Sequence, residues 1–338
     1  MPRSTFLMVG AAVGSLLMSP ILQADDAADG ATAYSATVEN DLFANTDRGY
    51  TNGIGYSWSH LVGNQFTAES LPQWIFNLAE HTYITTSAGK TRAVSYDIVQ
   101  TMQTPSNITV PEQIEGDAPY AGSLTWTVDL HAYDDFVSDT VALTLGTVGP
   151  LSLAEQSQKI IHQIVGSDEP QGWDNQIDNE PVFQVRAERL WRLGAHEFES
   201  GRGFDAVGIG QGAIGNLGSS VAVGGSVRFG RDLKSSFPTA TFLPNRRVCL
   251  RAPAGASAWH LFLSVRGAFV ANDIRINSNT FQEGYSVPLE HWQAQAAAGA
   301  TWTNGKWGFV ATAVVATRRF TGEESRSRFG AFSVTYQH

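Results

Sequence analysis

Gln158 and His162 stand four residues apart in a segment whose pattern predicts a short helix. Ser152 and Glu155 have the S-x-x-E spacing of a capping box, which predicts the start of this helix, and Gly166 is a typical C-terminal stop. The apolar residues of one predicted face are Leu153, Ile160, Ile161, Ile164 and Val165. The other face carries Glu155, Gln158 and His162, and the i, i+4 spacing brings the last two side chains together.

A histidine on a helix inserted between two strands can act as a general base, because imidazole titrates closest to neutral pH. His162 is therefore a candidate catalytic base, and Gln158 is placed to orient water or substrate. The alternative is an ordinary helix face in contact with solvent. A Ser-His-Asp hydrolase is the competing mechanism, but the sequence has no G-x-S-x-G motif and no serine between a strand and a helix.

A second group of candidates carries oxygen atoms that suit a hard cation. Glu39, Asn40 and Asp41 end a predicted strand, and Asp168 follows the predicted helix six residues after His162. Carboxylate and amide oxygens are ligands that calcium prefers, whereas zinc would need a His/Cys spacing that the sequence lacks. We therefore expect calcium held by Asp41 with help from Asn40 or Asp168. The alternative for Asn40 and Asp41 is a turn leading into the next loop.

The segments around these candidates alternate apolar and polar residues in about twelve strands, each long enough to cross a membrane at a tilt. The predicted strands span 34–41, 50–61, 92–102, 120–132, 140–147, 182–191, 198–211, 219–228, 259–272, 287–303, 306–318 and 328–338. Tight turns are predicted near Gly194, at 215–216 and at 303–305. Trp292 and Trp302 bracket one strand as aromatic residues at membrane interfaces do. The pattern predicts an all-β, 12-stranded antiparallel transmembrane barrel; a large soluble β-sandwich is the alternative.

The ends and the composition of the chain agree with an envelope protein. Residues 1–24 read as a secretory signal peptide, which leaves residues 25–338 as one barrel domain. The single cysteine, Cys249, excludes an intrachain disulfide, and a net charge of −10 argues against nucleic acid as a partner. We expect a monomer in the bacterial outer membrane.

Strand parity places the candidates relative to one another. If the amino terminus is periplasmic, odd-numbered strands run outward, and the end of the first strand, the start of the second and the helical insertion share the extracellular rim. The active site is expected at that rim. Parity places the long segment 232–257 on the periplasmic side, where the sequence indicates no role for it.

Three groups of motifs resemble the lipid A deacylase family LpxR. They are E-N-D-x-F…D-R-G-Y-T-N-G in 39–53, D-A-P-Y-A-G in 117–122, and L-G-T-V-G-P…Q-x-x-x-H…G-W-D-N-Q in 145–176. The resemblance covers nearly the whole mature chain. It implies a twelve-stranded outer-membrane barrel that removes the 3′-linked acyloxyacyl chain from lipid A of lipopolysaccharide and requires calcium.

Matched by motif, the family's catalytic histidine falls on His162, its Asn-Asp pair on Asn40 and Asp41, its threonine on Thr51 and its glutamine on Gln158. Its acidic position falls on Asp168, which is shorter than the glutamate expected there. The lysine that the family has just after the third strand has no counterpart in 103–113, so Arg48 or Lys159 is a candidate for binding substrate phosphate.

The sequence thus predicts a calcium-dependent outer-membrane ester hydrolase in which His162 takes a proton from water. Two alternatives stay open. An outer-membrane phospholipase-type esterase would share the ester hydrolysis, and a non-enzymatic porin or structural barrel would conduct ions and would not depend on His162.

Overall fold

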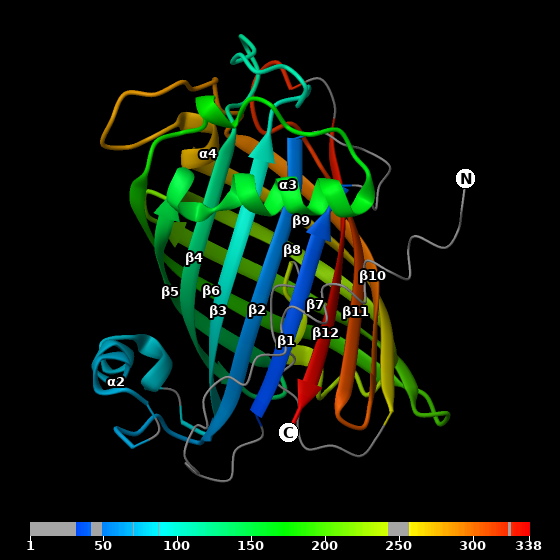
Figure 1. The fold of residues 1–338 in the computed structure, drawn as a ribbon. Helices are drawn as coiled ribbons and strands as arrows, with labels where there is room; N and C mark the ends of the chain where they lie inside the picture. Colours follow the sequence, from blue (N-terminus) through cyan, green and yellow to red (C-terminus); the bar gives the residue numbers. More distant parts are fainter. Residues whose placement is uncertain (1–31, 42–48, 70, 87, 243–256, 324–325) are drawn as a thin grey trace.

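The twelve predicted strands form a closed antiparallel barrel in which each strand pairs with its neighbours in the sequence and β1 pairs with β12 (Figure 1). The computed structural model describes residues 32–41, 49–69, 71–86, 88–242, 257–323 and 326–338, without the side chains of 49–52 and 165. The predicted signal peptide and Cys249 lie outside these residues. The strands are β1 (Thr32–Asn40), β2 (Gly49–Gly63), β3 (Thr91–Thr104), β4 (Ala121–Tyr133), β5 (Val137–Val148), β6 (Glu180–Glu197), β7 (Arg202–Ile214), β8 (Gly218–Arg231), β9 (Ala258–Asp273), β10 (Trp292–Asn304), β11 (Trp307–Ala316) and β12 (Ser327–Gln337).

Side chains alternate between the lumen and the outer surface, as the sequence pattern predicts. At the seam that closes the barrel, the hydroxyls of Ser333 and Thr335 bond to Thr37 (2.5 Å) and Ser35 (2.9 Å) inside the lumen. Phe332, which directly precedes Ser333, is exposed on the outer face. The period of two therefore decides which residues meet lipid and which stabilise the interior.

One predicted turn is wrong. Gly194 lies inside β6 at a bulge opposite β7, and the chain reverses four residues later, at 198–201. The turns at 215–217 and at 305–306 are confirmed, and Trp292 and Trp302 are both exposed on the outer wall. No helix in the described parts of the chain is long and apolar enough to cross a membrane.

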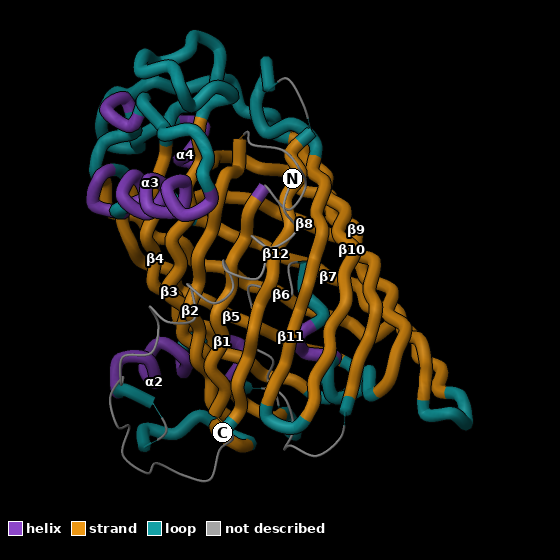
Figure 2. The backbone as a smooth tube through the Cα atoms, turned by 45° about the vertical axis from the view of Figure 1, so that its right-hand side comes forward, coloured by secondary structure: helices purple, strands orange, loops and turns teal. Residues whose placement is uncertain are grey.

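Two helices lie outside the wall at opposite ends of the barrel (Figures 1 and 2). Helix α2 (Gln73–Glu80) buries Ile75 and Ala79 against outward-facing residues of β3 and β4, among them Val94 and Leu130. Helix α3 (Ala154–Val165), in the loop after β5, lies near the other end. The two ends are called here the α2 end and the α3 end.

Ion pairs join strands on both faces of the wall. Inside the lumen, Asp129 accepts from Arg186 (2.5 Å). On the outer face at the α2 end, Asp139 accepts from Lys90 (2.8 Å) and Arg189 (2.6 Å), since Arg189 has the parity of the exposed Trp191. A buried charge needs such a partner, because a buried ion left unpaired destabilises the folded protein by several kcal/mol. The polar lumen is typical of outer-membrane barrels.

The segment after β8 folds back into the lumen from the α2 end. The short 3-10 helix η5 (Phe237–Thr239) places Phe237 against Leu190 of β6 and Ile209 of β7, and Phe242 joins the same cluster. These strand residues have the same parity as the lumen-facing Glu188 and Asp205, while Trp191, of the opposite parity, is exposed on the outside. Residues 232–242 therefore form a plug inside the barrel, which sequence parity alone does not predict.

A buried arginine holds this plug. Arg228 of β8 forms an ion pair with Asp205 (2.6 Å) and donates to the backbone carbonyl oxygens of Leu233 (2.8 Å) and Ser236 (3.0 Å). Thr241 donates to Glu188 across the lumen (3.1 Å). The guanidinium thus satisfies carbonyl groups that would otherwise be buried without partners.

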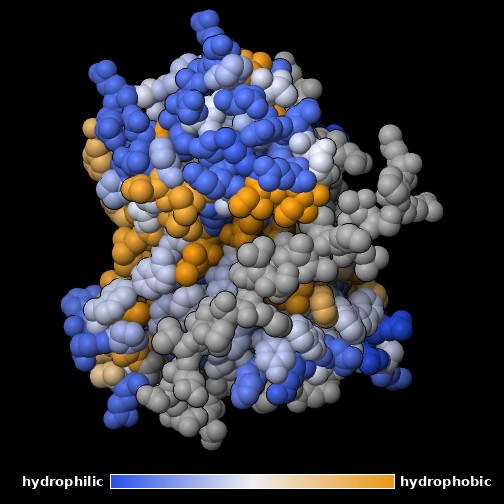
Figure 3. Space-filling model, viewed as in Figure 1, coloured by the Kyte–Doolittle hydropathy of each residue, from blue (hydrophilic) through white to orange (hydrophobic). Residues whose placement is uncertain are grey.

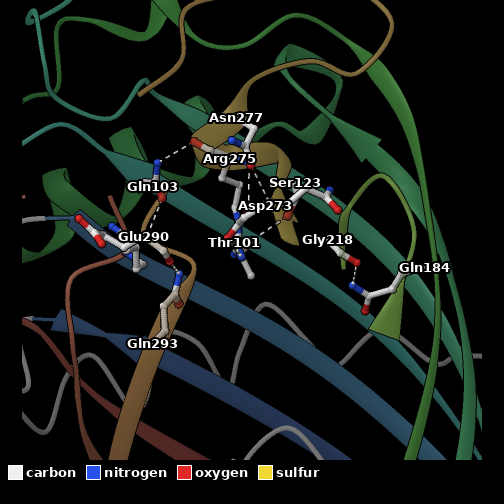
Figure 4. A network of polar contacts seen from close by, with 12 residues as sticks. Thr101, Gln103, Ser123, Gln184, Gly218, Asp273, Arg275, Asn277, Glu290 and Gln293 are labelled. Carbon is white, nitrogen blue, oxygen red and sulfur yellow. Dashed lines mark hydrogen bonds and ion pairs between the residues drawn. The ribbon is translucent and has the colours of Figure 1, made fainter. Parts of the chain in front are cut away.

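At the α3 end, α4 (Ile274–Asn277), which follows β9, lies over part of the lumen (Figure 4). Arg275 of α4 pairs with Asp273 (2.8 Å), and its carbonyl oxygen accepts from Gln103 of β3 (3.0 Å). Ile274 packs against lumen-facing apolar residues of β4, β5 and β6. The barrel is therefore filled at the α2 end and partly covered at the α3 end.

We expect the purified protein to show no steady ion conductance in planar bilayers, because the plug fills the lumen at the α2 end. A variant lacking 234–241 should conduct, since the residues packed against the lumen wall are then removed. A steady ohmic conductance of the wild type, like that of a porin, would contradict this description of the lumen.

Candidate functional site

Helix α3 is docked on the outer face of the barrel wall near the α3 end. It contacts β3 and β4. The 3-10 turn η3 (Pro150–Ser152) precedes it, and a Cβ at Gly122 of β4 would lie 2.2 Å from the Ser152 hydroxyl and 2.4 Å from the Cβ of Ala154. Only glycine leaves room for this approach, which explains the last residue of the D-A-P-Y-A-G motif.

The wall is also joined to this turn by a hydrogen bond. Gln100, on the outer face of β3, donates to the Ser152 carbonyl oxygen (2.6 Å). The predicted capping box is not formed: α3 begins at Ala154 with Leu153 as its N-cap, and the Ser152 hydroxyl accepts only from the Ala154 N–H (3.4 Å). Ser152 is instead held in the 3-10 turn, because it fills the space above Gly122. The predicted stop is confirmed, since Gly166 takes a left-handed conformation (φ 73°).

The polar face of α3 lies against the protein and its apolar face is exposed. Gln158 is 1% and His162 5% exposed, so the interpretation of these two as a solvated helix face is wrong. Ile160 and Ile164 are about half exposed. Figure 3 shows apolar side chains along α3 and on the wall below it. A helix with this orientation is expected where lipid, and not water, covers the outside.

The turn after α3 orients His162. Gly166 and Ser167 both donate to the His162 carbonyl oxygen, and the chain then brings the Asp168 carbonyl oxygen within 2.6 Å of His162 Nδ1. A carbonyl oxygen only accepts, so Nδ1 carries the proton and Nε2 has the lone pair of a base. The Asp168 side chain itself is exposed. Asp168 thus contacts His162 through its backbone.

The C-terminal end of α3 lies beside the end of β1 in both ribbon views (Figures 1 and 2). Asn40, the last residue of β1, has the parity of the exposed Tyr34 and so faces outward. Its side chain is nevertheless only 9% exposed, and Asp41, the next residue, is fully buried. Asn40 pairs with Asn52 of β2, next to Thr51. Thr51 is the extra residue of a bulge opposite β3, and its side chain lies outside the described residues.

The candidates therefore lie on two sides of the wall. Gln158 and His162 of α3 and Asn40 at the end of β1 lie on its outer side, whereas Glu39, of opposite parity to Asn40, faces the lumen. The candidate site is the contact region between α3 and the outer wall.

The sequence of the whole chain was compared with known families and structures. The family model described as "Outer membrane protein LpxR" matches residues 8–338. The chain belongs to the LpxR family.

Solved structures agree with this family at the level of the fold. LpxR from Salmonella typhimurium is similar with a TM-score of 0.74 and 18% identity, covering 90% of this chain and 99% of that one. The β domain of the Bordetella autotransporter BrkA (TM-score 0.46, 9% identity, 92% and 99% covered) and the KdgM porin (TM-score 0.36, 6% identity, 90% and 98% covered) are less similar. No curated protein sequence matches the chain. The protein is a twelve-stranded barrel of the bacterial outer membrane, as predicted.

Asn40 and Asp41, the proposed calcium ligands of this LpxR-family chain, are both buried and end in hard oxygen atoms. Glu39 is buried too, but it has the parity of Ser35 and Thr37 and so faces the lumen, away from Asn40. Within the described ranges no three His, Cys, Asp or Glu side chains cluster closely enough to hold a metal. Calcium also binds amide and backbone carbonyl oxygens, so carboxylate and amide ligands together at the end of β1 fit this ion. The Asp168 carboxylate is exposed and would join these ligands only from that exposed position.

Lys159 and Arg48 are the two candidates for binding substrate phosphate in this LpxR-family barrel, and the structure describes only the first of them. Lys159 lies on α3, forms an ion pair with Glu155 (2.8 Å) and is partly exposed. Its hydrogen bond with Glu155 raises the pKa of Lys159, so the ammonium stays charged. Arg48 lies outside the described residues.

Sequence reasoning missed Trp173, in the 3-10 turn η4 (Trp173–Asn175), although its motif G-W-D-N-Q was recognised. Trp173 is buried, and its indole Nε1 donates to Gln158 Oε1 (2.7 Å). The motif that contains Trp173 was the available signal in the sequence, but its spacing does not show that Trp173 contacts Gln158. That contact appears only in the folded chain.

Proposed function

We propose that the protein is a lipid A 3′-O-deacylase that hydrolyses the ester of the 3′-linked acyloxyacyl chain in the outer leaflet. The observation that carries the proposal is His162: it is buried between α3 and the outer wall, with Nδ1 on a backbone carbonyl oxygen and with the apolar face of α3 exposed on the lipid side. Membership of the LpxR family supports the same substrate.

The residues of the chain divide the reaction between them. The oxygen of a water molecule bonds to the ester carbonyl carbon while His162 Nε2 takes one of its protons. The bond from the carbonyl carbon to the sugar-side oxygen then breaks, and His162 returns the proton to that oxygen. The products are the free acyloxyacyl acid and a 3′-hydroxyl, and no oxidant or reductant is needed.

The surroundings of His162 favour this chemistry. The Asp168 carbonyl oxygen holds the imidazole in one tautomer, so no rotation is needed before proton transfer. Gln158 and Thr51 are proposed to orient the water or the ester. Calcium, held by Asp41 with Asn40, would supply positive charge for the oxyanion. Acyl chains would lie along the exposed face formed by Leu151, Leu153, Ile160 and Ile164.

The experiment that tests the proposal offers the enzyme a choice of esters. Purified protein in detergent is incubated with lipid A and phosphatidylethanolamine together, and both lipids are analysed by mass spectrometry. We expect lipid A to lose one acyloxyacyl chain and the phospholipid to stay intact. Loss of acyl chains from the phospholipid alone would instead assign a phospholipase.

A further inference from the structure

Gln158 is held in an unusual state for a buried amide. Its Oε1 accepts from Trp173 Nε1 at 2.7 Å, while its Nε2 is buried without a hydrogen-bond partner on the described residues. An indole N–H can only donate, so the amide oxygen of Gln158 faces Trp173. The NH2 group, on the other side of the planar amide, therefore points away from the indole N–H. A buried donor without a partner destabilises the folded protein, so such a group in a native structure calls for an explanation, and a catalytic role is one.

The face of α3 that carries this donor also carries the base. Ala154, Gln158 and His162 recur every four residues and are all buried, so they form one stripe toward the wall. The Gln158 side chain therefore leaves the helix one turn before His162, on the protein side of α3. An ester between them would meet a base and an N–H donor.

Trp173 is itself rigidly placed. Its ring lies 4.9 Å from that of Tyr120, and both belong to a buried cluster with Met102 and Ala154. A Cβ at Gly172 would lie 2.5 Å from the Tyr120 ring, so only glycine permits this approach. Burial raises the pKa of Tyr120 to about 12, so its hydroxyl stays protonated and donates to the Ile108 carbonyl oxygen (3.2 Å).

We propose that Trp173 is a positioning residue that fixes the Gln158 amide so that its Nε2 donates to the carbonyl oxygen of the ester. This rests on the proposed deacylase function. Without the indole N–H the amide can turn over, and its oxygen then repels the carbonyl oxygen as negative charge develops there. The indole thus decides which end of Gln158 meets the substrate.

The kinetic test is a double-mutant cycle on purified protein with lipid A. Trp173→Phe keeps an aromatic ring against Tyr120 but removes the donor, and should lower kcat about 10- to 100-fold with little change in KM. Gln158→Leu should lower kcat about 100-fold or more, as expected for losing an oxyanion donor. The double variant should be no slower than Gln158→Leu, because Trp173 acts only through Gln158.

Two matched controls separate positioning from packing. Tyr120→Phe removes a hydroxyl from the same cluster, and Gln156→Leu removes an exposed amide from the same helix; both should keep near wild-type kcat. Full activity of Trp173→Phe, or losses that multiply in the double variant, would overturn the proposal.

A spectroscopic readout keeps this result distinct from failure of the deacylase assignment. In nitrogen-15 spectra of the barrel in detergent micelles, the indole signal absent from Trp173→Phe identifies Trp173. We expect Gln158→Leu to shift that signal and Gln156→Leu to leave it in place. An unmoved signal in Gln158→Leu would refute the contact, whereas a shifted signal with no acyl release by the wild type would refute the proposed function alone.

Discussion

Replacing His162 with alanine is expected to abolish release of acyl chains from lipid A while the barrel stays folded. In the proposed mechanism the imidazole is the base that takes the proton of water, and losing a general base lowers the rate by a factor on the order of 10² to 10⁴. Because His162 lies on a helix outside the wall, the lumen ion pairs and the strand ladder do not depend on it. The measurement is acyl release by mass spectrometry, with heat-dependent gel mobility as the test of folding.

His291 provides the matched control for this variant. Its Nδ1 also bonds to a backbone carbonyl oxygen, that of Val270 (2.7 Å), but it is exposed and stands in the loop before β10. His291→Ala should retain near wild-type turnover. Near-normal turnover of a folded His162→Ala protein would remove His162 from the proposed mechanism.

Removal of calcium is expected to have an effect of similar size. The donors at the end of β1 are hard oxygen atoms, so chelator should stop acyl release, and calcium but not zinc should restore it. Magnesium should restore it poorly, because it requires a tight octahedral shell and holds its water molecules. Activity that is unchanged in excess chelator would show that groups of the protein alone hold the oxyanion.

Substitutions then locate the cation. Asp41→Asn keeps the shape but removes a buried charge, and should raise the calcium needed for half-maximal rate roughly tenfold or more. Asp168→Asn should have a weaker effect, because that side chain is exposed and contacts His162 through the backbone. Asp134→Asn, in the turn between β4 and β5 at the other end, is the control and should leave the calcium requirement unchanged.

The sequence predicted the barrel because a strand that separates lumen from lipid must alternate along its whole length. All twelve strands were found, with bounds that differ from the observed ones by at most six residues, the largest difference being at the end of β6. Of the local signals that depend on one residue, Gly166 at the end of α3 predicted correctly, whereas Gly194 did not mark a turn. The spacing of Gln158 and His162 indicated which face of the helix carries the candidate catalytic residues.

Features that depend on tertiary contact were not predicted. The capping box at Ser152 fails because the close approach to Gly122 decides that turn. Helix periodicity identified the two faces of α3 but not which of them is buried, because in a membrane protein the apolar face turns toward lipid. The plug at 232–242 was missed because its apolar residues, such as Phe237, show no period.

The most direct test of the deacylase assignment is a mass spectrum of the products formed from lipid A in oxygen-18 water. We predict that lipid A loses its 3′-linked acyloxyacyl chain and that the chain appears as a free acid carrying one oxygen-18 atom in its carboxyl group. Water attack at the ester carbonyl carbon requires that label. Unchanged lipid A, or a chain transferred to another lipid without label, would contradict hydrolysis by a water molecule that His162 activates.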